Sequence, residues 1–253
     1  MFSRAIVRKP CRNMVFGITS ADQGKPDYEI ALYQHSQYVK ALERAGLTVT
    51  VLEEDESFPD SVFVEDTALL TPNAAIITNP GAFSRIGEIH EVSRVVRGFY
   101  RNIEFILSPG NVDAGDIMMV GNHFYIGLSG RTNQEGARQM IKHLNKYGYT
   151  ASTIALKDVL HLKTGISYLE NNYLLACGEF LSKKELDHFN IIEVPKEEAY
   201  AANSLWVNGN VLVPEGFTKT RTLIERAGYK TIPVDVSEFR KLDGGLSCLS
   251  LRF

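Results

Sequence analysis

The chain has 253 residues, 44% of them hydrophobic and 23% charged, and this ordinary globular composition allows a sizeable buried core. A formal net charge of −3 and the lack of any basic run argue against a nucleic-acid partner. No stretch of about 18 apolar residues occurs, and residues 1–13 carry scattered charge, so neither a membrane span nor a signal peptide is expected. The three cysteines, Cys11, Cys177 and Cys248, have no paired spacing, which suits reduced thiols in a cytoplasmic protein.

The first predicted element is an amphipathic helix over 27–46, because Ile30, Tyr33, Val39 and Leu42 recur at helical spacing; a β-rich run follows it. Four apolar hairpins with turn residues at their centres come next. They are ALLTPNAAIIT (68–78), IMMVGNHFYIG (117–127), ISYLENNYLLA (166–176) and SLWVNGNVLVP (204–214). After the second and the fourth hairpin, a helix-like stretch (133–148 and 218–228) leads again into a β-rich run.

The recurring pattern is a ββαβ unit repeated every 40–50 residues or so, which is the scale of repeat arrays and propellers. A fifth hairpin is predicted from the two ends, with residues 247–253 pairing with residues 2–10, so that the termini close a ring and protect its edges. The sequence therefore predicts an α/β fold, a five-bladed α/β propeller of pseudo-symmetric ββαβ units in a single domain over residues 1–253. The alternative is an α/β sandwich in which the hairpins recur by coincidence.

Polar clusters flank the starts of the hairpins, so a ring would bring them together at one end of its axis. The clusters hold Asp60, Glu65 and Asp66; Asp113 and Asp116; His161; and Asp243 with Cys248. Converging carboxylates are costly to bury without a cation, which indicates a cationic ligand or a metal. No metal is expected, because there is no His-x-x-x-His or Cys-x-x-Cys spacing and a carboxylate cage would leave Cys248 unexplained.

Each of these residues, taken alone, also has a plain structural interpretation. Asp113 and Asp116 suit a turn around Ala114-Gly115, His161 suits a hydrogen-bonded structural histidine, and Cys248 suits a small buried hydrophobe. Their equivalent positions in successive units favour the functional interpretation. The remaining histidines, at 35, 90, 123, 143 and 188, are interpreted as structural.

Cys248 is expected on the last strand, just after a loop made flexible by Gly244 and Gly245. A nucleophilic sulfur needs such close access for its substrate. Two arginines occupy matching places after successive hairpins, Arg85 in NPGAFSRIGEIH and Arg131 in GLSGRTNQEG. Since the planar guanidinium binds carboxylates bidentately, this equivalence favours a shared anion-binding role over surface solubility.

Together these motifs resemble the dimethylarginine dimethylaminohydrolase family, which belongs to the guanidino-modifying (pentein) superfamily of five-bladed α/β propellers. The resemblance covers essentially the whole chain, and the motifs are specific as a set although each alone is weak. In chain order they are GITSADQGKPD, PDSVFVEDTA, NPGAFSRIGE, GLSGRTNQEG, LHLKTGISYL and LDGGLSCLSLRF.

The resemblance implies a role for each matching residue. Cys248 matches the nucleophile, His161 the general acid and base, and Asp113, with Asp66, the carboxylates that hold the guanidinium. The matches to substrate-binding residues are Arg85 and Arg131 for the α-carboxylate, Asp60 and Glu65 as further contacts, Ile18 as a lid residue and the Leu242 main chain for the amino group. One departure is Asp113-Ala114-Gly115-Asp116, where relatives often have Glu-Gly-Gly-Asp or Asp-Gly-Gly-Asp, so the carboxylate at 113 reaches one methylene less far than a glutamate.

The implied activity is hydrolysis of Nω-methylated arginines (asymmetric dimethylarginine and monomethylarginine) to citrulline and dimethylamine or methylamine, through a covalent S-alkylthiouronium on Cys248. The implied partner is a small guanidino amino acid, with no cofactor, and a homodimer is compatible with the resemblance. One alternative is a hydrolase or deiminase of arginine, citrulline or another guanidino or ureido compound, although arginine deiminases are usually longer. The other is a propeller that only binds partners, but such a protein has no reason to keep Cys248, His161, Asp66 and Asp113 together.

Overall fold

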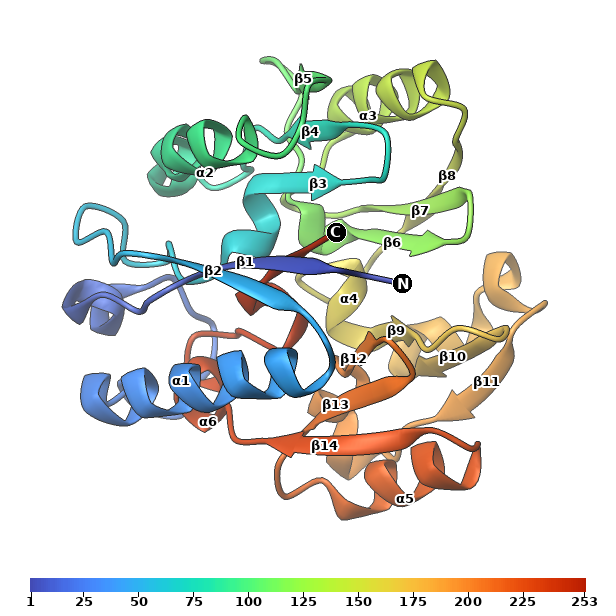
Figure 1. The fold of residues 1–253 in the computed structure, drawn as a ribbon. Helices are drawn as coiled ribbons and strands as arrows, with labels where there is room; N and C mark the ends of the chain where they lie inside the picture. The colour runs from blue at the N-terminus through green and yellow to red at the C-terminus, as the bar shows by residue number, and fades with distance from the viewer.

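The computed structural model describes all of residues 1–253 and shows five small sheets set around a common centre, with both chain ends near that centre (Figure 1). Every sheet has three strands, and its middle strand pairs antiparallel with one neighbour and parallel with the other. The predicted α/β propeller of five ββαβ units is therefore confirmed. The sheets are β15 (Leu251–Arg252), β1 (Arg4–Arg8) and β2 (Thr48–Leu52); β3 (Ala68–Leu70), β4 (Ala75–Ile77) and β5 (Ile103–Phe105); β6 (Ile117–Val120), β7 (His123–Leu128) and β8 (Thr150–Ala155); β9 (Ile166–Tyr168), β10 (Tyr173–Ala176) and β11 (Asn190–Glu193); β12 (Leu205–Val207), β13 (Asn210–Pro214) and β14 (Lys230–Val234).

The hairpins form where the sequence predicts them because their central residues suit tight turns. Asn208 and Gly209 have φ angles of 51° and 85°, and Gly121 has a φ of 57°, in the left-handed region that short hairpin turns require. Asparagine and glycine enter this region at little cost. The fifth hairpin joins the ends of the chain as predicted, since Ala5 pairs with Arg252 in the antiparallel pairing of β1 and β15.

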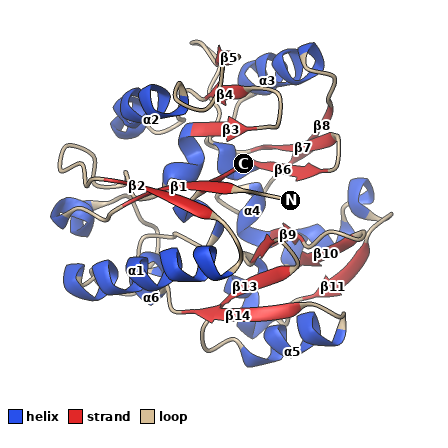
Figure 2. Ribbon diagram, viewed as in Figure 1, coloured by secondary structure: helices blue, strands red, loops and turns tan.

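The longer helices lie on the outside of the ring, and each connects the middle strand of a sheet to its third strand (Figure 2). They are α1 (Tyr28–Arg44), α2 (Ile89–Val96), α3 (Gln134–Lys146) and α5 (Thr218–Arg226). The fourth unit makes this connection with two 3₁₀ helices and no α-helix. The shorter α-helices are α4 (Leu162–Gly165) and α6 (Ser237–Arg240). The 3₁₀ helices are η1 (Arg12–Phe16), η2 (Val64–Thr67), η3 (Phe83–Glu88), η4 (Ala114–Asp116), η5 (Gly178–Ser182), η6 (Lys184–Leu186), η7 (Lys196–Ala202) and η8 (Ser247–Leu249).

The helix predicted over 27–46 is confirmed as α1, but two of the four apolar residues that indicated it lie on its exposed side. Ile30 and Tyr33 are 47% and 64% exposed. The buried stripe instead includes Ala31, Ala41 and Tyr38, and its alanines let the helix approach the sheet closely. The Tyr38 hydroxyl donates to the carbonyl of Leu246, 2.8 Å away, which ties α1 to the segment that carries Cys248. None of the helices has the length and apolar character needed to cross a membrane.

Candidate active site

The predicted polar residues come from equivalent places, because each unit makes a short helical turn just before its hairpin. Asp66 lies in η2, Asp116 in η4, His161 directly before α4 and Cys248 in η8. These turns contact one another at one end of the ring, η2 with both η4 and η8, and η4 with α4. Long-range assembly thus brings together residues far apart in the sequence, such as Asp66 and Cys248, which lie in two contacting turns.

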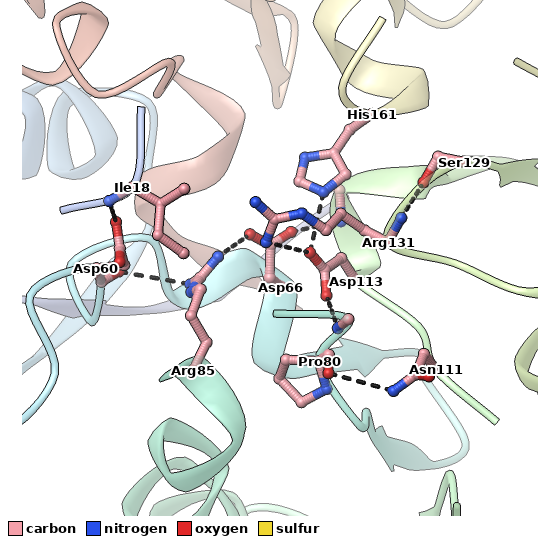
Figure 3. A network of polar contacts seen from close by, with 12 residues as sticks. Ile18, Asp60, Asp66, Pro80, Arg85, Asn111, Asp113, Ser129, Arg131 and His161 are labelled. Carbon is pink, nitrogen blue, oxygen red and sulfur yellow. Dashed lines mark hydrogen bonds and ion pairs between the residues drawn. The ribbon is translucent and has the colours of Figure 1, made fainter. Parts of the chain in front are cut away.

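His161 and Asp113 form a buried hydrogen-bonded pair, in which His161 Nε2 lies 3.0 Å from Asp113 Oδ2 (Figure 3). Asp113 is fully buried, and its other carboxylate oxygen accepts a hydrogen bond of 2.8 Å from the Gly81 amide. Burial disfavours the Asp113 anion, but the hydrogen bond and charge of His161 outweigh it and lower the pKa of Asp113. The pair is therefore an ionised carboxylate beside an imidazolium.

The charge of His161 follows from its neighbours. Burial alone would lower the pKa of His161, but the charge of Asp66, the hydrogen bond to Asp113 and the charge of Asp116 raise it to about 9. At neutral pH His161 therefore carries a proton, as a group that donates one to a leaving amine must.

Arg85 is buried and is held mainly by carboxylates of the protein itself. Its Nη1 lies 2.6 Å from Asp66 Oδ2, and its Nε and Nη2 donate to Glu88 at 2.8–3.1 Å. Nη2 also donates to the Phe63 carbonyl at 2.9 Å. One hydrogen on Nη1 is left without a partner among these contacts, so Arg85 has little capacity left for a ligand carboxylate.

A pocket lies against these charges, and we call it the arginine-lined pocket. The family resemblance assigns catalytic or substrate-binding roles to ten residues, and all of them except Asp113 and Glu65 line this pocket. Asp60 and Ile18 meet at its rim, where the Ile18 amide donates to Asp60 Oδ1 at 2.9 Å (Figure 3). The pocket is narrow, with a volume of about 40 Å³. It is lined by Ile18, Asp60, Phe63, Asp66, Arg85, Arg131, Leu160, His161, Leu242, Asp243, Gly244 and Cys248.

Arg131 lies nearer to solvent than Arg85 and is less tightly held. Its Nη1 is 3.9 Å from Asp113 Oδ2, which is an ion pair too long for a strong hydrogen bond. Its backbone amide donates to Ser129 Oγ at 3.0 Å, and Ser129 in turn donates to Asp116 at 2.6 Å. The guanidinium of Arg131 is therefore positioned at the pocket and remains available to an anion.

Cys248 lies in the η8 turn and not on the last strand as predicted. The two glycines before it serve close packing more than flexibility. A Cβ added to Gly244 would lie 2.2 Å from the Phe63 ring, and one added to Gly245 would lie 2.5 Å from Asn203. Cys248 is partly exposed, and its sulfur accepts a contact of 3.4 Å from the Gly245 amide.

The thiol of Cys248 is neutral in the unliganded protein. Burial raises its pKa, and the negative charges of Glu65 and Asp66 raise it further, to about 12. A cation bound next to Asp66 would offset these charges and favour the thiolate.

Glu65 does not line the arginine-lined pocket. Its carboxylate accepts from Lys163 at 2.6 Å, from Ser247 Oγ at 2.7 Å and from Arg252 at 3.0 Å. We call these four residues the Glu65 cluster. Both carboxylate oxygens of Glu65 thus accept from protein donors. The contact between Glu65 and the substrate stays a prediction, because neither oxygen is free for a ligand.

The residues that the sequence analysis missed are the partners of the predicted ones. Glu88 holds Arg85, and Ser247 and Lys163 hold Glu65. Lys163 stands two residues after His161 and Ser247 directly before Cys248, but no spacing signal shows which carboxylate they meet. Asp66, Asp113 and His161 have ligand atoms within 4.8 Å of one another, a spacing that could hold a metal ion. A charged His161 would first have to lose its proton, so the arrangement is better suited to an organic cation.

A propeller of five ββαβ units with a cysteine, a histidine and carboxylates at one end of its axis defines an enzyme of the guanidino-modifying superfamily. A family model described as "N,N dimethylarginine dimethylhydrolase, eukaryotic" matches residues 18–250. A dimethylarginine dimethylaminohydrolase of Pseudomonas aeruginosa is 57% identical over the full length of both chains. One from Streptomyces coelicolor is 31% identical over 98% of this chain and 96% of its own. The chain therefore belongs to the dimethylarginine dimethylaminohydrolase family.

Solved structures agree with this assignment. The Pseudomonas aeruginosa enzyme, as a cysteine-to-serine variant complexed with citrulline, superimposes with a TM-score of 0.99 at 57% identity over all of both chains. The N-terminal domain of ArgZ, an arginine dihydrolase from Cyanobacteria, gives a TM-score of 0.90 over 100% of this chain and 97% of that one. Because the two sequences are only 19% identical, this similarity supports the fold alone.

Proposed function

We propose that this protein hydrolyses Nω-methylated arginines to citrulline and dimethylamine or methylamine. The observation that carries the proposal is the meeting of Cys248 with a protonated His161 in a pocket that Asp66 lines. Asp113 lies directly behind this pocket and is hydrogen-bonded to His161. The relatives support it, because the Pseudomonas aeruginosa enzyme has been crystallised with citrulline. A histidine-to-glycine variant of a dimethylarginine dimethylaminohydrolase that is 57% identical to this chain has been crystallised as an adduct with S-methyl-L-thiocitrulline.

The charges of the pocket favour a guanidinium. Six carboxylates lie in or directly behind the pocket, against three cations, Arg85, Arg131 and His161. A bound guanidinium therefore reduces an excess of negative charge and needs no counter-ion of its own. The carboxylates are Asp60, Asp66, Glu88, Asp113, Asp116 and Asp243.

The amino-acid end of the substrate would bind at the mouth of the pocket. Arg131 is the main partner for the α-carboxylate, with the remaining hydrogen of Arg85 in support. Asp60 and the Leu242 carbonyl are the partners for the α-amino group, both being placed at the pocket wall. Since about 40 Å³ holds only a few water molecules, the segment at Ile18 has to move outward to admit an arginine.

In the first chemical step the Cys248 thiolate attacks the guanidinium carbon. Substrate charge next to Asp66 lowers the pKa of Cys248 from its resting value of about 12, and the thiol releases its proton to solvent as the substrate binds, which generates the nucleophile. The sulfur–carbon bond forms, the bond from carbon to the methylated nitrogen breaks, and His161 gives its proton to the departing amine. The product of this step is an S-alkylthiouronium on Cys248.

In the second step water replaces the sulfur. Neutral His161 now takes a proton from a water molecule, the new carbon–oxygen bond forms, and the sulfur leaves as thiolate. The second proton of the water passes to the released sulfur, so the product is neutral citrulline and the enzyme returns to a neutral Cys248 thiol beside a protonated His161. Neither step requires an electron acceptor or a cofactor.

The test is a product assay on asymmetric dimethylarginine, monomethylarginine, arginine, citrulline and agmatine. Arginine's unmethylated terminal nitrogen would leave N–H groups poorly satisfied, at a cost of about 1–3 kcal/mol, so methylated arginines should exceed arginine in kcat/KM by roughly ten- to a hundred-fold. Agmatine lacks the α-carboxylate and should lose about 2–4 kcal/mol of binding. Equal kcat/KM for arginine and asymmetric dimethylarginine would refute the selectivity and favour a deiminase, while efficient use of agmatine would refute the arginine assignments.

A further inference from the structure

A second opening reaches the reactive pair from the side away from the arginines. Cys248 and His161 line this opening as well as the arginine-lined pocket, and the rest of its wall includes Val159, Cys177, Ala199 and Tyr200. We call it the side cleft. Its volume is about 200 Å³, against about 40 Å³ for the arginine-lined pocket. It opens to solvent at Thr164, which is exposed.

The proposed chemistry needs such an opening. The amino-acid part of the substrate stays covalently attached to Cys248 between the two steps and fills the arginine-lined pocket. During that time a small amine must leave the neighbourhood of His161 and a water molecule must take its place. Because the narrow pocket is occupied, the exchange requires a second route to the same two side chains.

The wall of the side cleft suits the passage of small uncharged molecules. Val159, Cys177 and Ala199 present small or apolar groups. The polar groups nearby are already paired, since the Tyr200 hydroxyl donates to the Gly244 carbonyl at 2.8 Å and Asn203 accepts from the Ser247 amide at 3.0 Å. Two carboxylates also border the cleft, and both already accept hydrogen bonds from the protein. Glu65 is bound within its own cluster, and Asp243 Oδ2 accepts from the amide and the hydroxyl of Ser20 at 2.6 and 3.0 Å.

We propose that the side cleft is the site through which the leaving alkylamine departs and the hydrolytic water enters. This inference rests on the proposed function. After the carbon–nitrogen bond breaks, the amine carries the proton from His161 into the cleft. Water then arrives by the same path and gives one proton to the now neutral His161 as its oxygen bonds to carbon and the sulfur is released.

The experiment narrows the cleft without touching the reactive residues. Ala199 and Val159 are partly exposed, so Ala199→Leu and Val159→Phe can be tolerated by the fold. Ala227→Leu is the matched control, because Ala227 is also partly exposed but lies at the end of α5, outside the cleft. Asymmetric dimethylarginine is the substrate, thermal melting checks the fold, and intact-mass spectrometry under turnover detects a covalent adduct on Cys248.

We expect kcat of both cleft variants to fall about tenfold or more while KM stays within a factor of about two, since exchange and not binding becomes limiting. The control should match the parent. If the covalent adduct accumulates, water entry is the hindered step. If kcat falls but no adduct accumulates, amine departure is the hindered step. Unchanged kcat in both well-folded cleft variants would overturn the proposal. Failure of the parent protein itself to release amine from any methylated arginine would refute the proposed function instead.

Discussion

Glu65 and Asp66 are neighbours in the chain, yet they belong to two regions with opposite characters. Glu65 faces Lys163, Arg252 and Ser247, where one carboxylate is shared by two cations. Asp66 faces Arg85 and the His161 region, where carboxylates outnumber cations. The first region is internally paired and stabilises the fold at the centre of the ring. The second has an excess of carboxylates that an added cation would offset, which suits the proposed guanidinium substrate.

Cys248 stands at the boundary between these regions. Ser247, next to it, donates to Glu65, while the Cys248 sulfur lines both the arginine-lined pocket and the side cleft. The Glu65 cluster therefore positions the turn that carries Cys248, the proposed nucleophile. Four experiments separate the two regions.

The largest effect is expected where the two regions meet. Cys248→Ser should reduce kcat by a factor of about 10⁴ or more, because a serine hydroxyl lacks thiolate nucleophilicity, and it should leave the melting temperature nearly unchanged. The adjacent Ser247→Ala should instead lose about 1–3 kcal/mol of stability, because it leaves buried hydrogen-bonding groups without a partner. Steady-state kinetics and chemical denaturation of both variants measure the contrast. Near-normal turnover of Cys248→Ser would contradict the covalent mechanism.

The second effect tests the cationic acid of the Asp66 region. His161→Gln should lower kcat by about 10²–10⁴-fold, since the leaving amine loses its proton donor, and should change KM far less. Initial-rate measurements over a range of asymmetric dimethylarginine concentrations separate the two parameters. A kcat within a few-fold of the parent would make His161 a structural residue.

The third effect compares the adjacent carboxylates directly. Asp66→Asn should reduce kcat/KM by a factor of about 30–1,000, corresponding to roughly 2–4 kcal/mol for a lost charged contact to the guanidinium. Glu65→Gln should cost about 3–5 kcal/mol of unfolding free energy, because it leaves Lys163 and Arg252 buried without their anion. Kinetics and urea denaturation are needed for each variant. If Glu65→Gln raised KM without loss of stability, Glu65 would be a substrate contact after all.

The smallest effect is the pH dependence of stability. Folding raises the pKa of His161 from an ordinary 6.5 to about 9, so the native state holds a proton that the unfolded chain releases. This contribution to the free energy of unfolding is complete below pH 6.5 and is lost as the pH rises through 9. At 1.36 kcal/mol per pH unit, the protein should lose about 2 kcal/mol of stability between pH 7 and pH 8.5. Denaturation at both pH values measures it, with His161→Gln as the control that should lack this slope. An equal slope in both proteins would place the titrating group elsewhere.

Local sequence determined the units of the fold. Turn residues such as Asn208-Gly209 and the alternation of apolar residues around them specify hairpins, and these depend on contacts a few residues apart. The equivalent placement of Asp66, His161 and Cys248 before the hairpins also predicted that they would meet at one end of the ring. Periodicity was a weaker guide to α1, where Ile30 and Tyr33 are exposed because the sheet packs against the neighbouring alanine stripe.

The tertiary structure alone decided which charges pair with which. Glu65 meets Ser247 and Arg252 across 182 and 187 positions of sequence, and no local pattern distinguishes it from Asp66 beside it. Glu88, Asp66 and the Phe63 carbonyl together take most of the N–H donors of Arg85, which leaves Arg131 as the freer partner for an anion. The reason is that a buried charge must find its partner wherever the ring brings one within hydrogen-bond distance, and that distance is set by the packing of all five units.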